Sequence, residues 1–463
     1  MSATADERVA DDLRRRIAAA SPGDRLPSVR ELARLHAASP VTVQRALTRL
    51  SAEGAIDARP GRGTFVRARP AAEASPDFGW QTVTLGAARI DAGGLENLLA
   101  LPDPGAISLA GGFPEPALLP TSTLGAAVSR AARRASAWTR IPMEGLEDLR
   151  AWFARDAGGH VTASDVLVTA GAQSALATLF RALGRPSDEV IVEAPTYIGA
   201  LAAIRSAGLS PVPVATDGDG IRVDYLEETL KRSTARLIVL QPTHANPYGG
   251  VLSDERRQAV LELAERHEVF VVEDDYARDL TIDGPVPPTL VSRDRGGYVI
   301  QIRSLSKSTA PGLRVAAVVS RGPAAARLRA ARIVDDFFVS GMLQHTALEV
   351  VASPAWQRHL RHLRAELGRR RDVLVEGVRA WLPDWEIPFV PRGGLSLWVK
   401  LPAGTDDREL ALAAARAGVE VFPGRPWFAA EPPAPFLRLS FASAAESQLA
   451  DGVERLARAA GAD

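Results

Sequence analysis

Strand-length apolar runs alternate with helical stretches over most of the chain beyond Ile107, and this alternation limits the possible folds more than any other feature. Four clear runs are residues 166–169, 189–192, 237–240 and 298–301. A strand that is apolar at every position is buried on both faces, whereas a strand with one wet face alternates apolar and polar residues. Such strands separated by helices are typical of a parallel sheet with helices on both sides. We therefore expect an α/β fold from about residue 106 onward.

Chemically distinctive segments follow these runs, at the carboxyl ends where parallel sheets bind their ligands. In chain order they are 169–174, 194–197, Asn246-Pro247, 274–276, 304–307 and 311–314. The first, Thr-Ala-Gly-Ala-Gln-Ser, follows a strand and begins a helix, so its free backbone N–H groups suit a phosphate. Each segment alone is ordinary loop chemistry. Six of them in this order indicate one ligand site at the edge of the sheet.

Lys307 is one of only three lysines in a chain that carries 52 arginines. Arginine stays protonated and cannot form a Schiff base, whereas a lysine neutralised by its surroundings can. Lys307 has Ser304 and Ser306 beside it, and the run 269–276 ends in acids and a tyrosine. Pyridoxal 5'-phosphate (PLP) needs such a set, because its aldehyde needs an amine, its pyridine nitrogen an anion and its phosphate hydroxyl and backbone donors. The sequence therefore predicts PLP as the cofactor.

Composition limits the class of protein. Hydrophobic residues make up 46% of the 463 residues and charged residues 24%, which is typical of a soluble globular protein of two or three domains. The absence of cysteine excludes disulfides and thiolate metal sites. No apolar run has membrane-spanning length, and the first residues lack the pattern of a signal peptide. We expect a cytoplasmic protein without a metal site and without membrane contact.

Charge is unevenly distributed although the net charge is zero. Residues 1–70 contain 13 arginines, no lysine and eight acids, a net charge of +5, and the remainder has a net charge of −5. A basic N-terminal segment on an acidic body indicates an anionic partner for that segment.

The basic segment has the pattern of a winged helix. Val9, Leu13 and Ile17 share one helical face, and Ser28 can cap a second helix from Val29 to about His36. Ser39 as N-cap and Pro40 at the first helical position open a third helix, which runs to about Gly54. Residues 55–67 predict two short strands around a glycine-arginine tip. The third helix would enter the major groove of DNA; a small protein-binding domain is the alternative for this outline.

Three stretches of the segment resemble the GntR-type winged helix: 26–33, 42–50 and 61–66. The resemblance implies double-stranded DNA as partner, with an operator read by a small set of side chains. The implied contacts are Arg30, Ser39, Thr42, Gln44 and Arg45, with Arg62 in the wing. Pro40 departs from the family, where a polar or basic residue is common, so one expected contact is lost.

The order of motifs from about residue 105 to 463 resembles the fold type I, aminotransferase class I/II family of PLP proteins. The resemblance implies that Lys307 holds the aldehyde and that Asp274 pairs with the protonated pyridine nitrogen. Asn246 and Tyr276 would bind the ring hydroxyl, and Tyr197 would stack on the ring. The implied phosphate ligands are Ala172, Gln173, Ser304, Ser306 and Arg314. In an active enzyme, Lys307, Asp274 and Tyr276 would form the catalytic set.

Further positions follow from the same resemblance. Arg438, in the strand-like run 436–441, would clamp a carboxylate of the substrate or effector. Residues 111–114 resemble the substrate-side loop of the family. Asp275 is an alternative to Asp274 as the pyridine partner. Arg140 stands where the family often has a tyrosine that reaches the phosphate of the neighbouring subunit.

A GntR-type segment joined to an aminotransferase-like body resembles the MocR/PdxR-like transcriptional regulators. The expected domains are 1–70 (winged helix), 71–105 (linker and entry segment), 106–339 (large PLP-binding domain) and 340–463 (small α+β domain). The resemblance implies a homodimeric regulator that binds PLP as a Schiff base and senses PLP or a small amino-group effector. An active PLP-dependent aminotransferase with an accessory winged helix is the main alternative, and a PLP storage protein is a third.

Overall fold

The computed structural model describes residues 5–59, 62–67, 77–86 and 93–461. Contacts divide the chain into two compact units, Met1–Ala88 and Arg89–Asp463. The expected combination of a winged helix and a mostly parallel α/β sheet is present in these two units.

The first unit contains the winged helix. Its elements are α1 (Ala5–Ala19), α2 (Val29–Leu35), α3 (Pro40–Ala52), β1 (Ile56–Arg59) and β2 (Gly63–Val66). Ser28 caps α2 in a capping box with Glu31, and the hydroxyl of Ser39 caps α3 by accepting from the backbone N–H of Thr42 at 3.1 Å. The strands pair in antiparallel register, with Ile56 opposite Val66. Apolar side chains from all three helices and both strands form one small core.

Two short helices lie in the segment that the sequence presents as a linker. They are α4 (Gly79–Leu85) and α5 (Gly93–Leu99). The apolar side chains of Trp80 and Val83 on α4 are exposed. Neither helix has enough apolar periodicity to be predicted from the sequence.

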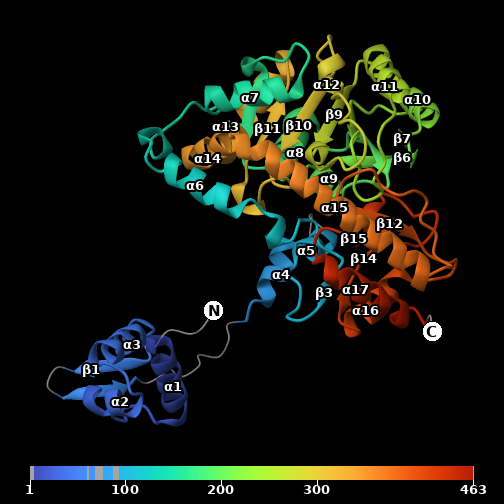
Figure 1. The fold of residues 1–463 in the computed structure, drawn as a ribbon. Coiled ribbons are helices and arrows are strands. Elements are labelled where there is room, and N and C mark those ends of the chain that lie inside the picture. The colour runs from blue at the N-terminus through green and yellow to red at the C-terminus, as the bar shows by residue number, and fades with distance from the viewer. Residues whose placement is uncertain (1–4, 60–61, 68–76, 87–92, 462–463) are drawn as a thin grey trace. The chain divides into compact units, whose positions relative to one another are not determined.

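An eight-stranded sheet forms the centre of the second unit (Figure 1), in the order β4-β11-β10-β9-β8-β5-β6-β7. Its strands are β4 (Val166–Thr169), β5 (Glu189–Ala194), β6 (Ser210–Asp217), β7 (Gly220–Ile221), β8 (Leu237–Leu240), β9 (Phe270–Asp275), β10 (Val299–Ser304) and β11 (Ala316–Val319). Only β7 and β11 run antiparallel to their neighbours. The four sequence-predicted runs coincide with β4, β5, β8 and β10 to within a few residues.

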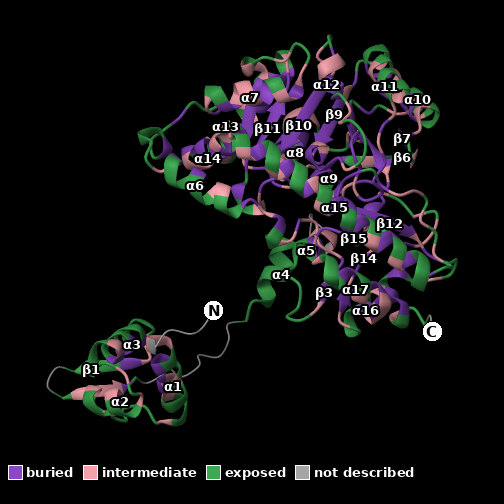
Figure 2. Cartoon of the chain, in the orientation of Figure 1, coloured by how far each residue is buried: buried purple, intermediate pink, exposed green. Residues whose placement is uncertain are grey.

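Helices cover both faces of this sheet, as the strand composition requires. One face packs against α8 (Ala172–Leu183), α9 (Ile198–Ser206) and α13 (Gly322–Asp336). The other packs against α7 (Glu147–Ala157), α10 (Val223–Arg232), α11 (Asp254–His267), α12 (Leu290–Arg293) and α14 (Gly341–Val351). Val190 and Val192 belong to the first core and Ile191 to the second, so consecutive residues point to opposite faces. Apart from β6, where most residues are exposed or half-buried, the strands of this sheet are buried along most of their length (Figure 2).

A second, smaller core lies around a three-stranded antiparallel sheet. That sheet has the order β12-β15-β14, with β12 (Ser396–Lys400), β14 (Phe422–Pro423) and β15 (Phe436–Ser440). The helices packed with it are α15 (Pro354–Trp381), α16 (Asp407–Arg416) and α17 (Glu446–Ala459).

The domain boundaries at 105/106 and 339/340 stay predictions. The structure adds that β3 (Ile107–Ser108) pairs with β13 (Val419–Glu420), and that α14 packs on α6 (Thr121–Ala131) and α7.

Candidate cofactor site and DNA-binding surface

Parallel pairing brings the carboxyl ends of five strands to one edge of the large sheet. The segments that leave these ends carry Gly171 after β4, Tyr197 after β5, Asn246 after β8, Tyr276 after β9 and Lys307 after β10. β4 runs in the same direction as the other four strands, because it is antiparallel to β11 and β11 is antiparallel to β10. The sequence-predicted residues therefore converge, although more than a hundred residues separate the first from the last.

The amine of Lys307 lies against the segment of residues 110–114. Its Nζ donates a hydrogen bond to the carbonyl of Gly112 at 2.7 Å and lies 3.2 Å from the centroid of the Phe113 ring. Burial lowers the pKa of this amine to about 7, with further lowering by Arg438 and Arg314 and opposition from Asp274. An amine with a pKa near neutrality is a nucleophile at physiological pH, which an ordinary lysine is not.

Asp274 and Asp275 end β9 and have different surroundings. The Oδ2 of Asp274 accepts a hydrogen bond from the side-chain amide of Gln241 at 2.7 Å, while its Oδ1 is buried and has no partner. Burial raises the pKa of Asp274 to about 6, against the hydrogen bond from Gln241. Asp275 accepts from Gln301 and lies beside Arg278. Only Asp274 therefore offers an unused oxygen on the side of Lys307.

Arg438 is a buried cation without an anionic partner among the described residues. Only 1% of it is exposed, and its Nη1 donates to the carbonyls of Ala110 and Gly111 at 3.0 and 3.2 Å. Its Nε donates to Oδ1 of Asn246 at 3.0 Å, and its guanidinium faces the Trp427 ring. Burying an unpaired charge is costly, so such an arginine is expected to bind an anion supplied by a ligand.

The start of α8 and the side chain of Arg314 lie side by side. Gly171 precedes the helix with φ of +93°, and no side chain caps it. A Cβ at this position would lie 2.6 Å from Nη2 of Arg314, so glycine is required for the approach. Strand register aligns Ser304 on β10 with Ala316 on β11 and Thr169 on β4. A helix N-terminus, hydroxyls and a guanidinium therefore lie at the same edge of the sheet, an arrangement that suits a phosphate.

Several buried polar atoms at this edge of the sheet have no hydrogen-bond partner. They are Oγ1 of Thr169, Oε1 of Gln173, Oδ1 of Asp274 and Oγ of Ser306. Unpaired buried polar atoms are rare in native proteins, so a group of them at one edge of the sheet is typical of a ligand site. The acceptor Oδ1 of Asp274 matches the protonated ring nitrogen of PLP, and the hydroxyls of Thr169 and Ser306 match its phosphate, so these residues fit that cofactor.

The two tyrosines lie within the same electrostatic environment. Burial raises the pKa of both Tyr197 and Tyr276, and both sense the charges of Asp274 and Arg438. The hydroxyl of Tyr276 donates to the carbonyl of His244 at 2.7 Å. The side chain of Gln173 donates to the carbonyl of Gly199 at 2.8 Å, on the helix that follows Tyr197.

Sequence reasoning missed three residues of this region. Gln241 and His244 lie in the loop after β8, and Glu193 lies near the end of β5. Glu193 accepts hydrogen bonds from the hydroxyl of Tyr248 and the backbone N–H of Gln241, both at 2.7 Å. Burial raises its pKa to about 7. Their positions at strand ends are the signal by which they could have been found.

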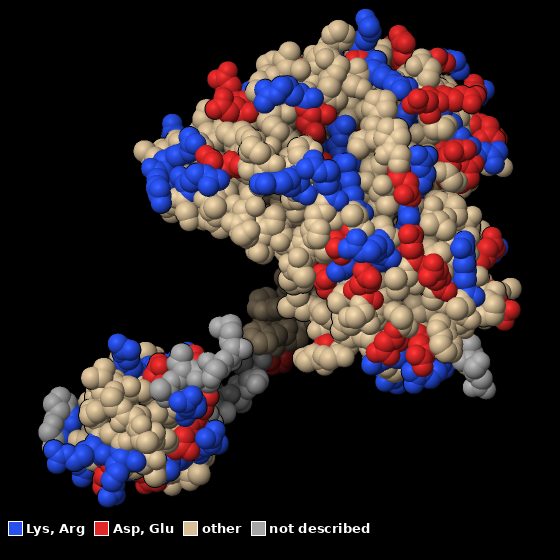
Figure 3. All heavy atoms as spheres, in the orientation of Figure 1, with Lys and Arg blue, Asp and Glu red and all other residues tan. Residues whose placement is uncertain are grey.

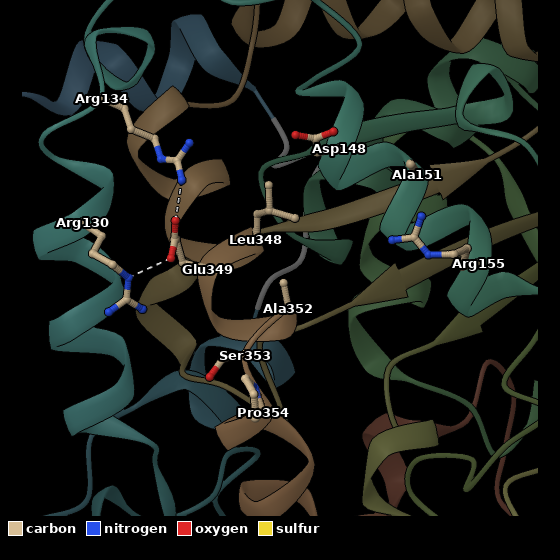
Figure 4. Close-up of a pocket in the computed structure, with 10 residues that line it drawn as sticks. All are labelled: Arg130, Arg134, Asp148, Ala151, Arg155, Leu348, Glu349, Ala352, Ser353 and Pro354. Atoms are coloured by element: carbon tan, nitrogen blue, oxygen red, sulfur yellow. Dashed lines mark hydrogen bonds and ion pairs between the residues drawn. The ribbon is translucent and has the colours of Figure 1, made fainter.

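A surface cavity of about 600 Å³ lies elsewhere, between α6, α7 and α14 (Figure 4). Arg130 on α6 and Arg134, which follows that helix, both bind Glu349 on α14, at 2.8 and 2.6 Å. None of the residues that line this cavity belongs to the cofactor set. Its charges are largely paired with one another.

The predicted DNA contacts lie on exposed parts of the winged helix. Arg30, Gln44, Arg45 and Arg62 are exposed, and arginine side chains are visible over the surface of this domain in Figure 3. The hydroxyls of Ser39 and Thr42 share a hydrogen bond of 2.8 Å at the start of α3. Val41 beside them is 62% exposed. It was not singled out from the sequence, although an exposed apolar residue at this end of the helix suits a thymine methyl.

Both the winged helix and the α/β part of the chain match known protein families. The aminotransferase class I and II family matches residues 124–456, and the gntR family of bacterial regulatory proteins matches residues 5–66. The uncharacterized HTH-type transcriptional regulator YdcR of Escherichia coli is 30% identical over 445 residues, 94% of each chain. The chain belongs to the MocR-like regulators. It is also a member of the aminotransferase class I and II family.

The body of this MocR-like regulator is similar to characterised enzymes. The 2-aminoadipate transaminase of Thermus thermophilus is 33% identical over 381 residues, covering 81% of this chain and 95% of the relative. The crystal structure of LysN, alpha-aminoadipate aminotransferase from the same species, complexed with N-(5'-phosphopyridoxyl)-L-leucine, superposes with a TM-score of 0.75 at 31% identity. It covers 80% of this chain and 95% of that one. The cofactor of the regulator is PLP, as the sequence predicts.

The described residues contain neither a candidate metal centre nor a membrane-spanning helix. No group of three or more histidine, cysteine or acidic side chains there could hold a metal ion. Within the same part of the chain, every helix is too short or too polar to span a bilayer.

Proposed function

We propose that this MocR-like regulator binds PLP through Lys307 and adjusts its affinity for operator DNA in response to PLP or a small amino-group effector. One observation carries the proposal: a neutralisable amine and an unpaired buried guanidinium share a site, in a chain that also has a GntR winged helix. An amine and a guanidinium at one site suit ligands that have both an amino group and a carboxylate.

Different residues of the chain would bind different parts of the cofactor. The aldehyde would join Nζ of Lys307, and the free Oδ1 of Asp274 would face the protonated ring nitrogen. Bound in this way, PLP supplies an electron-accepting ring and an exchangeable carbonyl for amino compounds. Asn246 and Tyr276 would bind the ring hydroxyl, and Tyr197 would stack on the ring.

The phosphate would lie at the start of α8. The implied donors are the backbone of Ala172 and Gln173, the hydroxyls of Ser304 and Ser306, and the guanidinium of Arg314. The unpartnered hydroxyl of Ser306 and the approach of Arg314 to Gly171 support this placement.

The effector would carry a carboxylate. Arg438 is the clamp, since its charge has no protein anion to neutralise it in the described part of the chain and its planar fork suits a bidentate carboxylate. Ligand binding would replace carbonyl contacts from Ala110 and Gly111 with a charged partner. For a switch, this gain would have to differ between the conformations of high and low DNA affinity.

DNA would be read by α3 and the wing. Arg30, Ser39, Thr42, Gln44, Arg45 and Arg62 are the proposed contacts, and Val41 is added because of its exposure. Coupling between effector and DNA binding is typically worth about 1–3 kcal/mol, or roughly 5- to 150-fold in affinity.

A homodimer would present two winged helices to a repeated operator. Trp138 and Phe337 on the body are each 71% exposed, which is unusual for large apolar side chains. Gly341 lies against Ser136 and Ala137, so the nearby Trp138 and Phe337 belong to the same region of this unit. Exposed apolar surface of this kind marks protein contacts.

An active aminotransferase is the second candidate. The observation that favours it is the complete set of amine, ring-nitrogen partner and carboxylate clamp, together with the similarity to 2-aminoadipate transaminase. The two functions differ in turnover, since a sensor needs to bind its ligand but not to release a 2-oxo acid repeatedly.

One experiment separates them. PLP-loaded protein is bound to DNA from upstream of its own gene, and a panel of amino acids is added while 2-oxo acid formation is followed in the same samples. We expect at least one amino compound to move the DNA-binding midpoint with less than one equivalent of product formed. Sustained product formation with an unchanged midpoint would favour the enzyme.

A further inference from the structure

The side chain of Gln241 joins two parts of the cofactor site. It leaves the end of β8, next to β9 in the sheet. Its Nε2 donates to Oδ2 of Asp274 at 2.7 Å, and its Oε1 accepts the backbone N–H of Asn246 at 2.8 Å. Both functional atoms of one buried amide are therefore used, one on each of two residues assigned to the cofactor.

The backbone of Gln241 is also fixed by a hydrogen bond. Its backbone N–H donates to Oε2 of Glu193, whose other oxygen accepts from the hydroxyl of Tyr248. All three residues are at most 4% exposed. A side chain fixed in this way has one available orientation, because rotating the amide would place its oxygen against a carboxylate.

We propose that Gln241 is the positioning residue of the cofactor site: it occupies one oxygen of Asp274, leaves the other for the ring nitrogen, and links Asp274 to the carboxylate clamp. The link continues through Asn246, whose Oδ1 accepts from Nε of Arg438. The inference rests on the proposed function, since it assigns how the proposed nitrogen partner is oriented.

The hydrogen bond from Gln241 also keeps Asp274 ionised. Burial is the main cause that raises the pKa of Asp274 to about 6, and the bond from Gln241 is the largest cause that lowers it. Other ionisable groups that sense or affect this carboxyl are Glu193, Tyr197, Asp275, Tyr276 and Lys307. Without the bond, Asp274 would take up a proton at a higher pH and lose its charge toward the ring nitrogen.

The chain offers a matched control beside Asp275, the next residue of β9. Gln301 on β10 donates its Nε2 to Oδ2 of Asp275 at 3.1 Å and is fully buried. The same amide-to-carboxylate bond therefore occurs beside Asp274 and beside Asp275. Gln241→Leu and Gln301→Leu remove equivalent groups, but only the first touches the carboxyl that faces Lys307.

The test measures binding of pyridoxine phosphate, which has the ring and the phosphate but no aldehyde, as a function of pH. Gln241→Leu should move the midpoint of the pH profile up by about one unit, since one pKa unit corresponds to a tenfold change. Binding should therefore weaken about tenfold at pH values below the wild-type midpoint and only about twofold near pH 7. Gln301→Leu should leave the affinity and the midpoint at wild-type values. A wild-type affinity and midpoint in Gln241→Leu would overturn the inference.

Gln241→Glu is the second variant and decides the question if Gln241→Leu does not fold. Its carboxyl still accepts from Asn246 and, when protonated, can donate to Asp274. Two adjacent carboxyls share one proton, so at about pH 6 binding should be within about twofold of wild type and should fall below it as the pH rises. Parallel pH profiles for Gln241→Glu and wild type would contradict the inference.

The failure of the proposed function has a different signature. If the wild-type protein binds neither PLP nor pyridoxine phosphate, the proposed function and the inference both fall. If the wild-type protein binds both ligands and the Gln241 variants match it, only the role of Gln241 is wrong.

Discussion

Asp274 and Asp275 are consecutive residues whose carboxylates have separate partners. Asp274 accepts from Gln241 and senses Lys307, whereas Asp275 accepts from Gln301 and lies 3.6 Å from Arg278. Consecutive residues of a strand point to opposite faces of the sheet, so one carboxylate reaches the cofactor edge and the other a buried ion-pair network. The structure thereby favours Asp274 over Asp275 as the ring-nitrogen partner.

Asparagine substitutions distinguish these two roles. Asp274→Asn should reduce PLP affinity by at least about tenfold, because a hydrogen bond to a charged group contributes about 1.5–3 kcal/mol. Asp275→Asn should retain PLP affinity but lower stability by about 3 kcal/mol, since it leaves Arg278 and Arg303 with one acid fewer in a buried site. Equilibrium dialysis and urea unfolding measure the two effects. An equal loss of affinity in both variants would contradict the assignment.

The rate at which PLP attaches to Lys307 should depend on pH. The pKa of the amine is lowered to about 7, mainly by burial, so the neutral and nucleophilic form predominates above that pH. The rate should fall about tenfold for each pH unit below 7 and level off above it. Stopped-flow absorbance follows the reaction. A rate that keeps rising to pH 10 would show that the lysine has an ordinary pKa.

Substitution of Lys307 tests whether it is the attachment point. Lys307→Ala should fold normally and lose covalent attachment, because the other lysines, Lys231 and Lys400, form exposed ion pairs with Glu227 and Glu386. Borohydride reduction followed by mass spectrometry checks this. A reduced cofactor still attached to Lys307→Ala would contradict it.

Arg438 should select ligands by their carboxylate. In PLP-loaded Arg438→Lys, the affinity for an amino acid should fall about thirtyfold, equivalent to about 2 kcal/mol for a charge-assisted pair, while the affinity for the matching amine should not change. Spectral titration with both ligands gives the ratio. Wild-type selectivity in the variant would exclude Arg438 as the clamp.

The winged helix should bind DNA independently of cofactor loading. Arg45→Ala should weaken operator binding and reduce the salt dependence by about one ion, because each phosphate contact releases a counterion. Arg15→Ala on α1, which removes an exposed pair with Asp12, is the control. PLP content should stay normal in both. Loss of the cofactor in Arg45→Ala would show that the two parts are not independent.

The strand-end motifs were predictable because they depend on local pattern. Continuous apolar runs identify strands buried on both faces, and polar residues directly after them must lie at one edge of a parallel sheet. The caps at Ser28 and Ser39 were likewise visible in the sequence, since N-capping involves residues three apart.

The hydrogen bonds that orient the residues of the site could not be predicted from the sequence. The bond from Gln241 to Asp274 spans 33 residues and depends on the pairing of β8 with β9, and that from Arg438 to Asn246 spans 192. Which of two consecutive aspartates faces the site depends on strand orientation, which the sequence leaves open. The helices α4 and α5 could not be predicted because each has only seven residues and a weak helical periodicity of apolar residues.

The most direct test of the account is a fluorescence anisotropy titration of DNA from upstream of the protein's own gene, with and without PLP, at fixed salt and with competitor DNA. Fixed salt is needed because non-specific binding by a basic domain varies steeply with ionic strength. The account predicts competitor-resistant binding whose midpoint moves with PLP in the wild-type protein but not in Lys307→Ala. Binding that competitor DNA abolishes, with the same midpoint in the presence and absence of PLP, would contradict it.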